Sequence, residues 1–132
     1  MERDEIFNPG VQVDAGFAQI VLQHNRTGQR VSLPPISYLA WVEDGREFVH
    51  CLELDLLADG LSKQEALETL KNVILEQMKS AKEEGTQIYH PAPKTYWDKF
   101  YEVRRNRFTQ AFLDTALTRR EIKVRDLTLT HA

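Results

Sequence analysis

The chain has 132 residues, of which 42% are hydrophobic and 28% are charged, as expected for a single globular domain and not for a disordered chain. Its longest unbroken apolar run, residues 38–42, is far shorter than the roughly 18 residues of a membrane span, and its charged N-terminus lacks the apolar core of a signal peptide. The single cysteine, Cys51, excludes an intrachain disulfide and a four-cysteine zinc site. These features predict a cytoplasmic protein without a membrane segment.

Charge is unevenly distributed along the chain. Residues 1–93 carry 8 Lys and Arg against 15 Asp and Glu, a net charge of −7, whereas residues 94–132 carry 9 against 5, a net charge of +4. The acidic part would repel nucleic acid and attract a basic protein. The basic C-terminal part is typical of a solvated helix face.

Short strands are expected near the N-terminus. Residues 1–16 mix charges with proline and glycine and predict a loose lead-in. The apolar run 17–24 is bounded by glycines and is typical of a strand. Residues 31–33 predict another strand that stops at two prolines, because proline cannot donate a ladder hydrogen bond.

A β-hairpin is predicted next. Residues 38–42 and 48–57 flank Asp44 and Gly45, and an Asp-Gly pair between two β-prone runs is typical of a tight turn. Alternation along the second run would place two sets of side chains on opposite faces, namely His50, Leu52, Leu54 and Leu56 on one and Val49, Cys51, Glu53 and Asp55 on the other. We expect a helix to cover the leucine face, while the other face meets water or a partner.

A long helix is expected over residues 63–84. Ser62 and Glu65 match a capping box at its start, and Gly85 stands where a left-handed C-cap residue belongs. Apolar residues recur between them at helical spacing, at Leu67, Leu70, Ile74, Met78 and Ala81.

A second helix is expected to begin near Pro93 or Lys94. Aromatic and arginine residues recur along it at helical spacing. The aromatic residues offer more apolar surface than a small domain needs for its own core, and this excess predicts a homo-oligomer interface. This interface would comprise Trp97, Phe100, Tyr101, Arg104, Phe108 and Phe112. The alternative is that the helix packs on its own domain. Residues 121–130 are β-prone and predict a terminal strand that could pair with another subunit.

Together these elements predict an α+β fold. We expect a small antiparallel sheet of three to four strands with one long helix packed on a face, followed by a C-terminal helix and strand. The loose lead-in would cover residues 1–16, and the compact α+β domain would cover residues 17–93. Residues 94–132 would form an extension that packs on the domain or on a partner subunit.

Several short segments follow one another in a fixed order within residues 36–93, namely 51–55 (CLELD), 60–66 (GLSKQEA), Gly85 and 88–93 (IYHPAP). This ordered series resembles the HicB family of type II antitoxins. The resemblance implies a partial ribonuclease H-like fold and a partner, a small basic ribonuclease toxin of the HicA family, which the domain would bind and block. Many members add a DNA-binding module, but here a helix precedes the expected strand, which argues against a ribbon-helix-helix and against DNA binding.

A metal-dependent nuclease is the enzymatic alternative. Glu53 and Asp55 lie two residues apart on one expected strand, and clustered carboxylates hold Mg²⁺ in such enzymes. No third carboxylate stands at a comparable place, since Glu65 is explained by capping, and the four histidines are scattered. We therefore expect no catalytic residues, no metal site and no cofactor.

The leading hypothesis is a HicB-like antitoxin or an orphan relative, a non-catalytic protein-binding module that covers the RNA-binding face of its toxin. Its docking surface would be acidic, formed by Glu43, Asp44, Glu53 and Asp55. The rival hypothesis is a self-assembling structural or regulatory module without a toxin.

Overall fold

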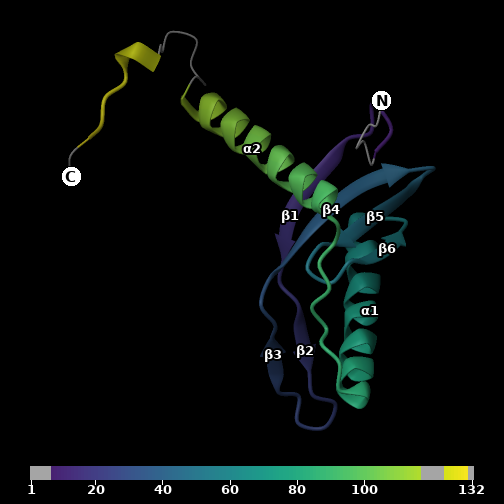
Figure 1. The fold of residues 1–132 in the computed structure, drawn as a ribbon. Helices are drawn as coiled ribbons and strands as arrows, with labels where there is room; N and C mark the ends of the chain where they lie inside the picture. The colour runs from purple at the N-terminus through teal and green to yellow at the C-terminus, as the bar shows by residue number, and fades with distance from the viewer. Residues whose placement is uncertain (1–6, 117–123, 131–132) are drawn as a thin grey trace.

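The computed structural model describes residues 7–116 and 124–130. Its centre is a four-stranded antiparallel sheet in the order β1-β4-β5-β6, and a separate two-stranded hairpin pairs β2 with β3 (Figure 1). The fold is α+β, as predicted. The elements are β1 (Val13–Ala18), β2 (Val21–Gln23), β3 (Arg30–Ser32), β4 (Ile36–Glu43), β5 (Arg46–Cys51), β6 (Leu56–Gly60), α1 (Lys63–Glu84), α2 (Lys94–Ala116) and a 3₁₀ turn, η1 (Val124–Asp126).

The predicted hairpin is formed by β4 and β5. Glu43 pairs with Arg46 across the turn, and Asp44 and Gly45 both have positive φ, 51° and 76°. Two consecutive positive φ values twist the turn in the sense that antiparallel strands require, which is why Asp-Gly is favoured there. The expected strand 17–24 is divided instead: β1 starts at Val13, within the expected lead-in, and β2 follows after a break.

The second strand of the hairpin also differs from the prediction. It ends at Cys51, and a turn over residues 52–55 separates it from β6. Asp55 adopts a left-handed φ of 53° in this turn, a conformation that Asp tolerates better than most residues. The turn interrupts the alternation, so the assignment of residues 48–57 to two continuous faces is wrong.

Each face of the sheet is covered by a helix. The long helix α1 packs on the face that carries Val49, Cys51 and Ala58, with Leu70 and Ile74 pointing into that core. The expectation that it covers the His50 and Leu52 face is therefore wrong. Leu39 and Leu52 lie in a second core on the opposite face, since neighbouring residues of a strand point to opposite faces.

The ends of α1 are as predicted. Ser62 has an extended backbone, and its Oγ accepts a hydrogen bond from the backbone N of Glu65 at 3.1 Å. Gly85 closes the helix with φ 67°, the left-handed conformation that glycine adopts without steric cost. The buried residues of the helix are Ala66, Leu70, Ile74 and Ala81.

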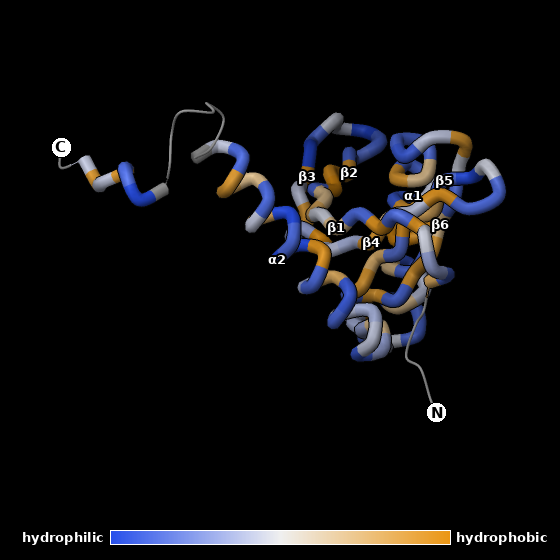
Figure 2. The backbone as a smooth tube through the Cα atoms, turned by 90° about the horizontal axis from the view of Figure 1, so that it is seen from above, coloured by the Kyte–Doolittle hydropathy of each residue, from blue (hydrophilic) through white to orange (hydrophobic). Residues whose placement is uncertain are grey.

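The second helix, α2, has two different halves. Its first half packs on the face opposite α1, against β1 and β4, and Phe100 is 2% exposed there. Its outer half, residues 105–116, extends away from the sheet, and Arg107 reaches back from it to β1 (Figures 1 and 2). The expected terminal strand is wrong for residues 124–130, which contain η1 and no regular strand; residues 121–123 lie outside the described residues. Among the helices described, none combines the length and apolar character that crossing a bilayer requires.

An ionic cluster at the sheet edge joins both helices to β1. Asp14 accepts a hydrogen bond from Lys63 Nζ at 3.0 Å and forms an ion pair with Arg107, whose Nη1 also donates to the carbonyl of Ala15 at 3.0 Å. Burial raises the pKa of Asp14, but the hydrogen bond and charge of Lys63 and the charge of Arg107 lower it more, so this pKa lies below its ordinary value. The cluster thereby fixes where α2 leaves the sheet.

Replacing Ser62 by alanine removes the capping oxygen, so we expect the free energy of unfolding to fall by about 0.5–2 kcal/mol. Urea unfolding measures the change. Thr69→Ala, on the exposed surface of the same helix, is the matched control and should leave the midpoint unchanged or raise it slightly. A Ser62→Ala midpoint equal to that of the unaltered chain would show that the cap contributes nothing.

Replacing Asp14 by asparagine should lower the free energy of unfolding by about 0.5–1 kcal/mol at neutral pH, because its ion pairs are partly exposed. A carboxyl group whose pKa is lowered by folding stabilises the protein at any pH above its ordinary pKa, and this stability is lost as the pH falls through the pKa of the folded state. The difference in free energy of unfolding between the unaltered chain and Asp14→Asn should therefore vanish in acid. Unfolding at several pH values tests this, with Asp98→Asn, in an exposed pair with Lys94, as the control. A difference that persists in acid contradicts the role of the charge.

Candidate functional site

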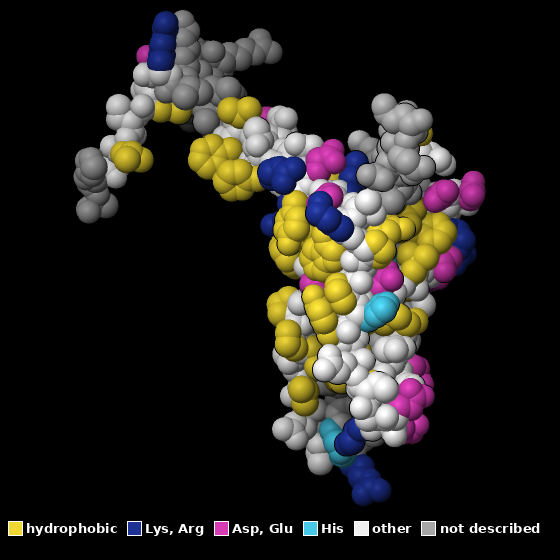
Figure 3. Space-filling view, in the orientation of Figure 1, with side chains coloured by type: hydrophobic (Ala, Val, Ile, Leu, Met, Phe, Trp, Pro, Cys, Tyr) yellow, Lys and Arg dark blue, Asp and Glu magenta, His cyan; other side chains and the backbone are white. Residues whose placement is uncertain are grey.

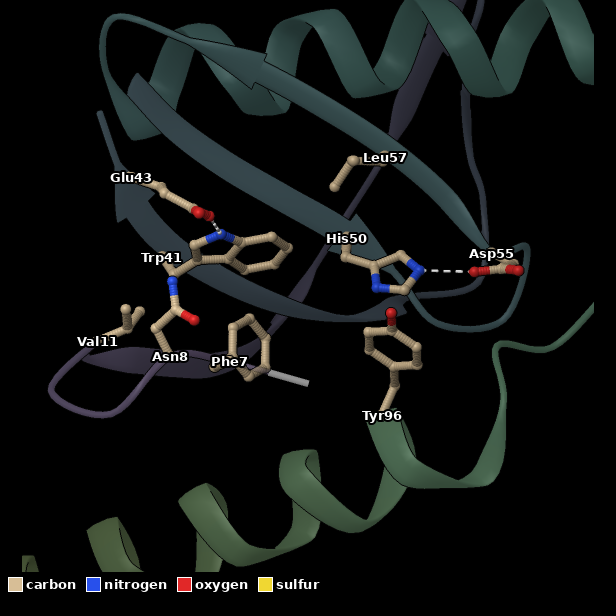
Figure 4. Close-up of a pocket in the computed structure, with 9 residues that line it drawn as sticks. All are labelled: Phe7, Asn8, Val11, Trp41, Glu43, His50, Asp55, Leu57 and Tyr96. Carbon is tan, nitrogen blue, oxygen red and sulfur yellow. Dashed lines mark hydrogen bonds and ion pairs between the residues drawn. The ribbon is translucent and has the colours of Figure 1, made fainter. Parts of the chain in front are cut away.

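The candidate site is a pocket on the sheet beside the first turn of α2. The main contacts of α2 with the sheet are with β1 and β4, and its first turn also reaches β5, where Tyr96 meets the His50 ring. A pocket of about 370 Å³ lies there, with aromatic walls from Phe7, Trp41 and Tyr96 and polar groups from Glu43, His50 and Asp55 (Figure 4). Asn8, Val11 and Leu57 complete the lining. We call it the aromatic pocket.

Ring contacts hold the walls of the aromatic pocket in place. Trp41 stacks on Phe48 with ring centroids 5.6 Å apart, and Phe7 meets Trp41 edge-on at 4.8 Å. Opposite them, Tyr96 from the first turn of α2 meets the His50 ring edge-on at 4.7 Å. Edge-on and offset arrangements are the favoured geometries of aromatic pairs. The walls are thus built from three segments that are distant in the sequence.

Two carboxylates lie at opposite ends of the pocket (Figure 4). Glu43 Oε1 accepts a hydrogen bond from Trp41 Nε1 at 3.2 Å. Asp55 Oδ1 lies 2.7 Å from Nε2 of His50, a residue only 6% exposed. The turn between β5 and β6 positions Asp55 for this contact. Each bond engages one carboxylate oxygen and orients the group.

The structure brings together two of the four residues predicted to bind a partner. Glu43 and Asp55 both line the aromatic pocket. Glu53 does not line it, because its carboxylate accepts a hydrogen bond from the backbone N of Ser37 at 2.8 Å and ties the turn to β4. Asp44 stands in the exposed hairpin turn, next to the pocket but outside its lining.

Sequence reasoning did not identify the other pocket residues as a group. The sequence pattern predicts only a strand for Trp41, a place on the leucine face for His50 and no site for Tyr96. The one local signal is the five-residue separation of His50 and Asp55, which brings the two side chains together only because a turn lies between them.

The residues predicted to form an oligomer interface divide into two groups. Phe100 is buried in the chain's own core, and Trp97 packs beside it with ring centroids 6.0 Å apart. Arg104 lies over the Phe17 ring at 4.6 Å. Three aromatic residues remain largely exposed, namely Tyr101 at 52%, Phe108 at 68% and Phe112 at 65%.

Other chemistry-bearing residues are distributed as follows. Within residues 7–116 and 124–130, no three His, Cys, Asp or Glu side chains converge in a way that could hold a metal ion. Cys51 is fully buried against α1, and burial raises the pKa of its thiol to about 11. At neutral pH it is therefore a protonated thiol packed in the core.

Comparison with known proteins gives no relative: no protein-family model matches the chain, and no curated protein or solved structure matches it significantly.

Proposed function

We propose that the chain is a HicB-like, non-catalytic protein-binding module that neutralises a small basic ribonuclease by covering its RNA-binding face. The observation that carries this proposal is the aromatic pocket, where two oriented carboxylates stand in a concave aromatic surface. Such a surface is suited to a protein partner that presents cations.

Charge supports a basic partner. Residues 1–93 have a net charge of −7, and complementary charge accelerates encounter and selects among partners. In this mechanism the module performs no chemistry. It binds over the cationic surface that the ribonuclease needs for RNA and thereby excludes the substrate.

The outer half of α2 supports self-association as part of the same proposal. Phe108 and Phe112 contact each other with ring centroids 5.3 Å apart and form an apolar patch with Ala111 (Figure 3). We assign a second copy of this chain as its occupant, because the neighbouring exposed Arg105 complements the acidic body that a second copy presents. The rival function, a self-assembling module without a toxin, would use the same patch.

The antitoxin function predicts a gene for a small basic protein with a histidine in its toxin domain beside this gene. Expression of that protein should arrest bacterial growth, and co-expression of this chain should restore it. The double variant Glu43→Gln/Asp55→Asn should bind the toxin about tenfold more weakly, since each lost charge pair contributes modestly. The control, Glu76→Gln/Glu83→Gln on exposed positions of α1, should bind normally. The absence of such a gene, or growth arrest that this chain does not relieve, would contradict the antitoxin function and favour the rival one.

Self-association predicts a dimer at micromolar concentration in sedimentation velocity. Phe108→Ser/Phe112→Ser should weaken it by about thirtyfold or more, because buried aromatic anchors each contribute more than about 1 kcal/mol. Asn106→Ser, on nearly the opposite side of the same helix, is the matched control and should leave the dimer intact. A monomeric full chain at this concentration would contradict the assignment.

A further inference from the structure

We infer that the aromatic pocket binds the guanidinium group of an arginine side chain presented by the partner protein. This inference rests on the proposed function, because it takes the partner to be a protein. It goes further by naming one recognition site and the side chain that enters it.

The electrostatics of the pocket favour a cation. Glu43 and Asp55 contribute two carboxylates, and no Lys or Arg from the described part of the chain lines the pocket. Among the four oxygens of these two carboxylates, only Glu43 Oε1 and Asp55 Oδ1 make hydrogen bonds to other residues in the described part of the chain. The second oxygen of each carboxylate therefore remains to accept an N–H donor from a ligand. An anion would meet repulsion at both ends.

The walls favour arginine over lysine. Trp41, Phe7 and Tyr96 present aromatic surfaces, and a planar guanidinium stacks on such surfaces while it donates hydrogen bonds in its own plane. An ammonium group is more strongly hydrated and gains less from leaving water. The volume of about 370 Å³ lies at the lower end of the range for ligand sites and admits one long side chain.

The pocket is also preorganised. Its carboxylates are already oriented by Trp41 and His50, so little side-chain freedom is lost when a ligand binds. The engaged indole N–H offers a local probe, because a ligand on Glu43 would disturb the bond that Trp41 donates to it.

The test is a titration of the full chain with the peptide acetyl-Gly-Arg-Gly-amide, followed by ¹H–¹⁵N spectra of the Trp41 indole N–H. A Trp97→Phe variant assigns this signal, since the chain has two tryptophans. We expect a saturable shift, and none with the peptide in which citrulline, its uncharged analogue, replaces arginine. Glu43→Gln keeps an oxygen for Trp41 and should weaken binding about fivefold. Asp44→Asn, one residue away and outside the lining, should change it less than twofold.

Equal shifts with the arginine and citrulline peptides, or equal losses in Glu43→Gln and Asp44→Asn, would overturn the inference. Binding of the free amine agmatine without binding of the peptide would also overturn it and identify a small-molecule site. The peptide is independent of any toxin. If the peptide binds but the chain does not relieve growth arrest, the antitoxin function is contradicted and the arginine site stands. If the chain relieves growth arrest but the peptide does not bind, the arginine site is contradicted and the antitoxin function stands.

Discussion

The turn between β5 and β6 is the constraint on which the aromatic pocket depends. Leu52 is fully buried, its backbone N donates to the carbonyl of Ser37, and its own carbonyl accepts from Ala92. Glu53 fixes the same turn in two ways, since its carboxylate accepts from the Ser37 backbone and its carbonyl accepts from His90. The four residues 52–55 thus join β4, the end of β5 and the extended segment that leads into α2. Asp55 follows in the left-handed conformation that lets its carboxylate reach His50.

The course of α2 follows from this turn and from the ionic cluster at the sheet edge. The backbone N of Ala92 donates to the carbonyl of Leu52, and Asp14 pairs with Arg107, so α2 is held at the turn between β5 and β6 and at β1. A helix held in this way lies mainly over β1 and β4 and reaches β5 at Tyr96, which meets the His50 ring. The aromatic pocket lies beside this first turn of α2, where residues of β4, β5 and β6 meet Phe7.

Local signals predicted much of the fold. The Asp-Gly turn and both caps of α1 depend on residues within a few positions of one another, where backbone conformation and side-chain hydrogen bonds determine the outcome. Gly60 has a similar local cause, because a Cβ there would lie 2.8 Å from the backbone N of Ala66.

The break after Cys51 was missed because leucines continue to alternate through residues 52–56 and conceal the turn. The pocket could not be predicted, since Phe7, Trp41 and Tyr96 meet only when three distant segments pack together. Helical spacing likewise placed Phe100 and Phe108 in one stripe, but only the extent of the sheet determines that Phe100 is buried and Phe108 is exposed.

The two proposed surfaces both include residues of α2, at different places along the helix. Tyr96 lines the aromatic pocket at the start of α2, and Phe108 lies in the patch on its outer half. Twelve residues of α-helix separate them by about 18 Å along the axis, so an arginine side chain in the pocket does not reach the patch. A dimer through α2 would therefore present two aromatic pockets on one assembly. Two linked sites raise the avidity for a partner that offers two arginines, or for two partner molecules that themselves associate, without any new contact within either pocket. Under the two proposals, self-association and partner binding would use different parts of the chain, and the self-assembling module would differ from the antitoxin only in what enters the pockets.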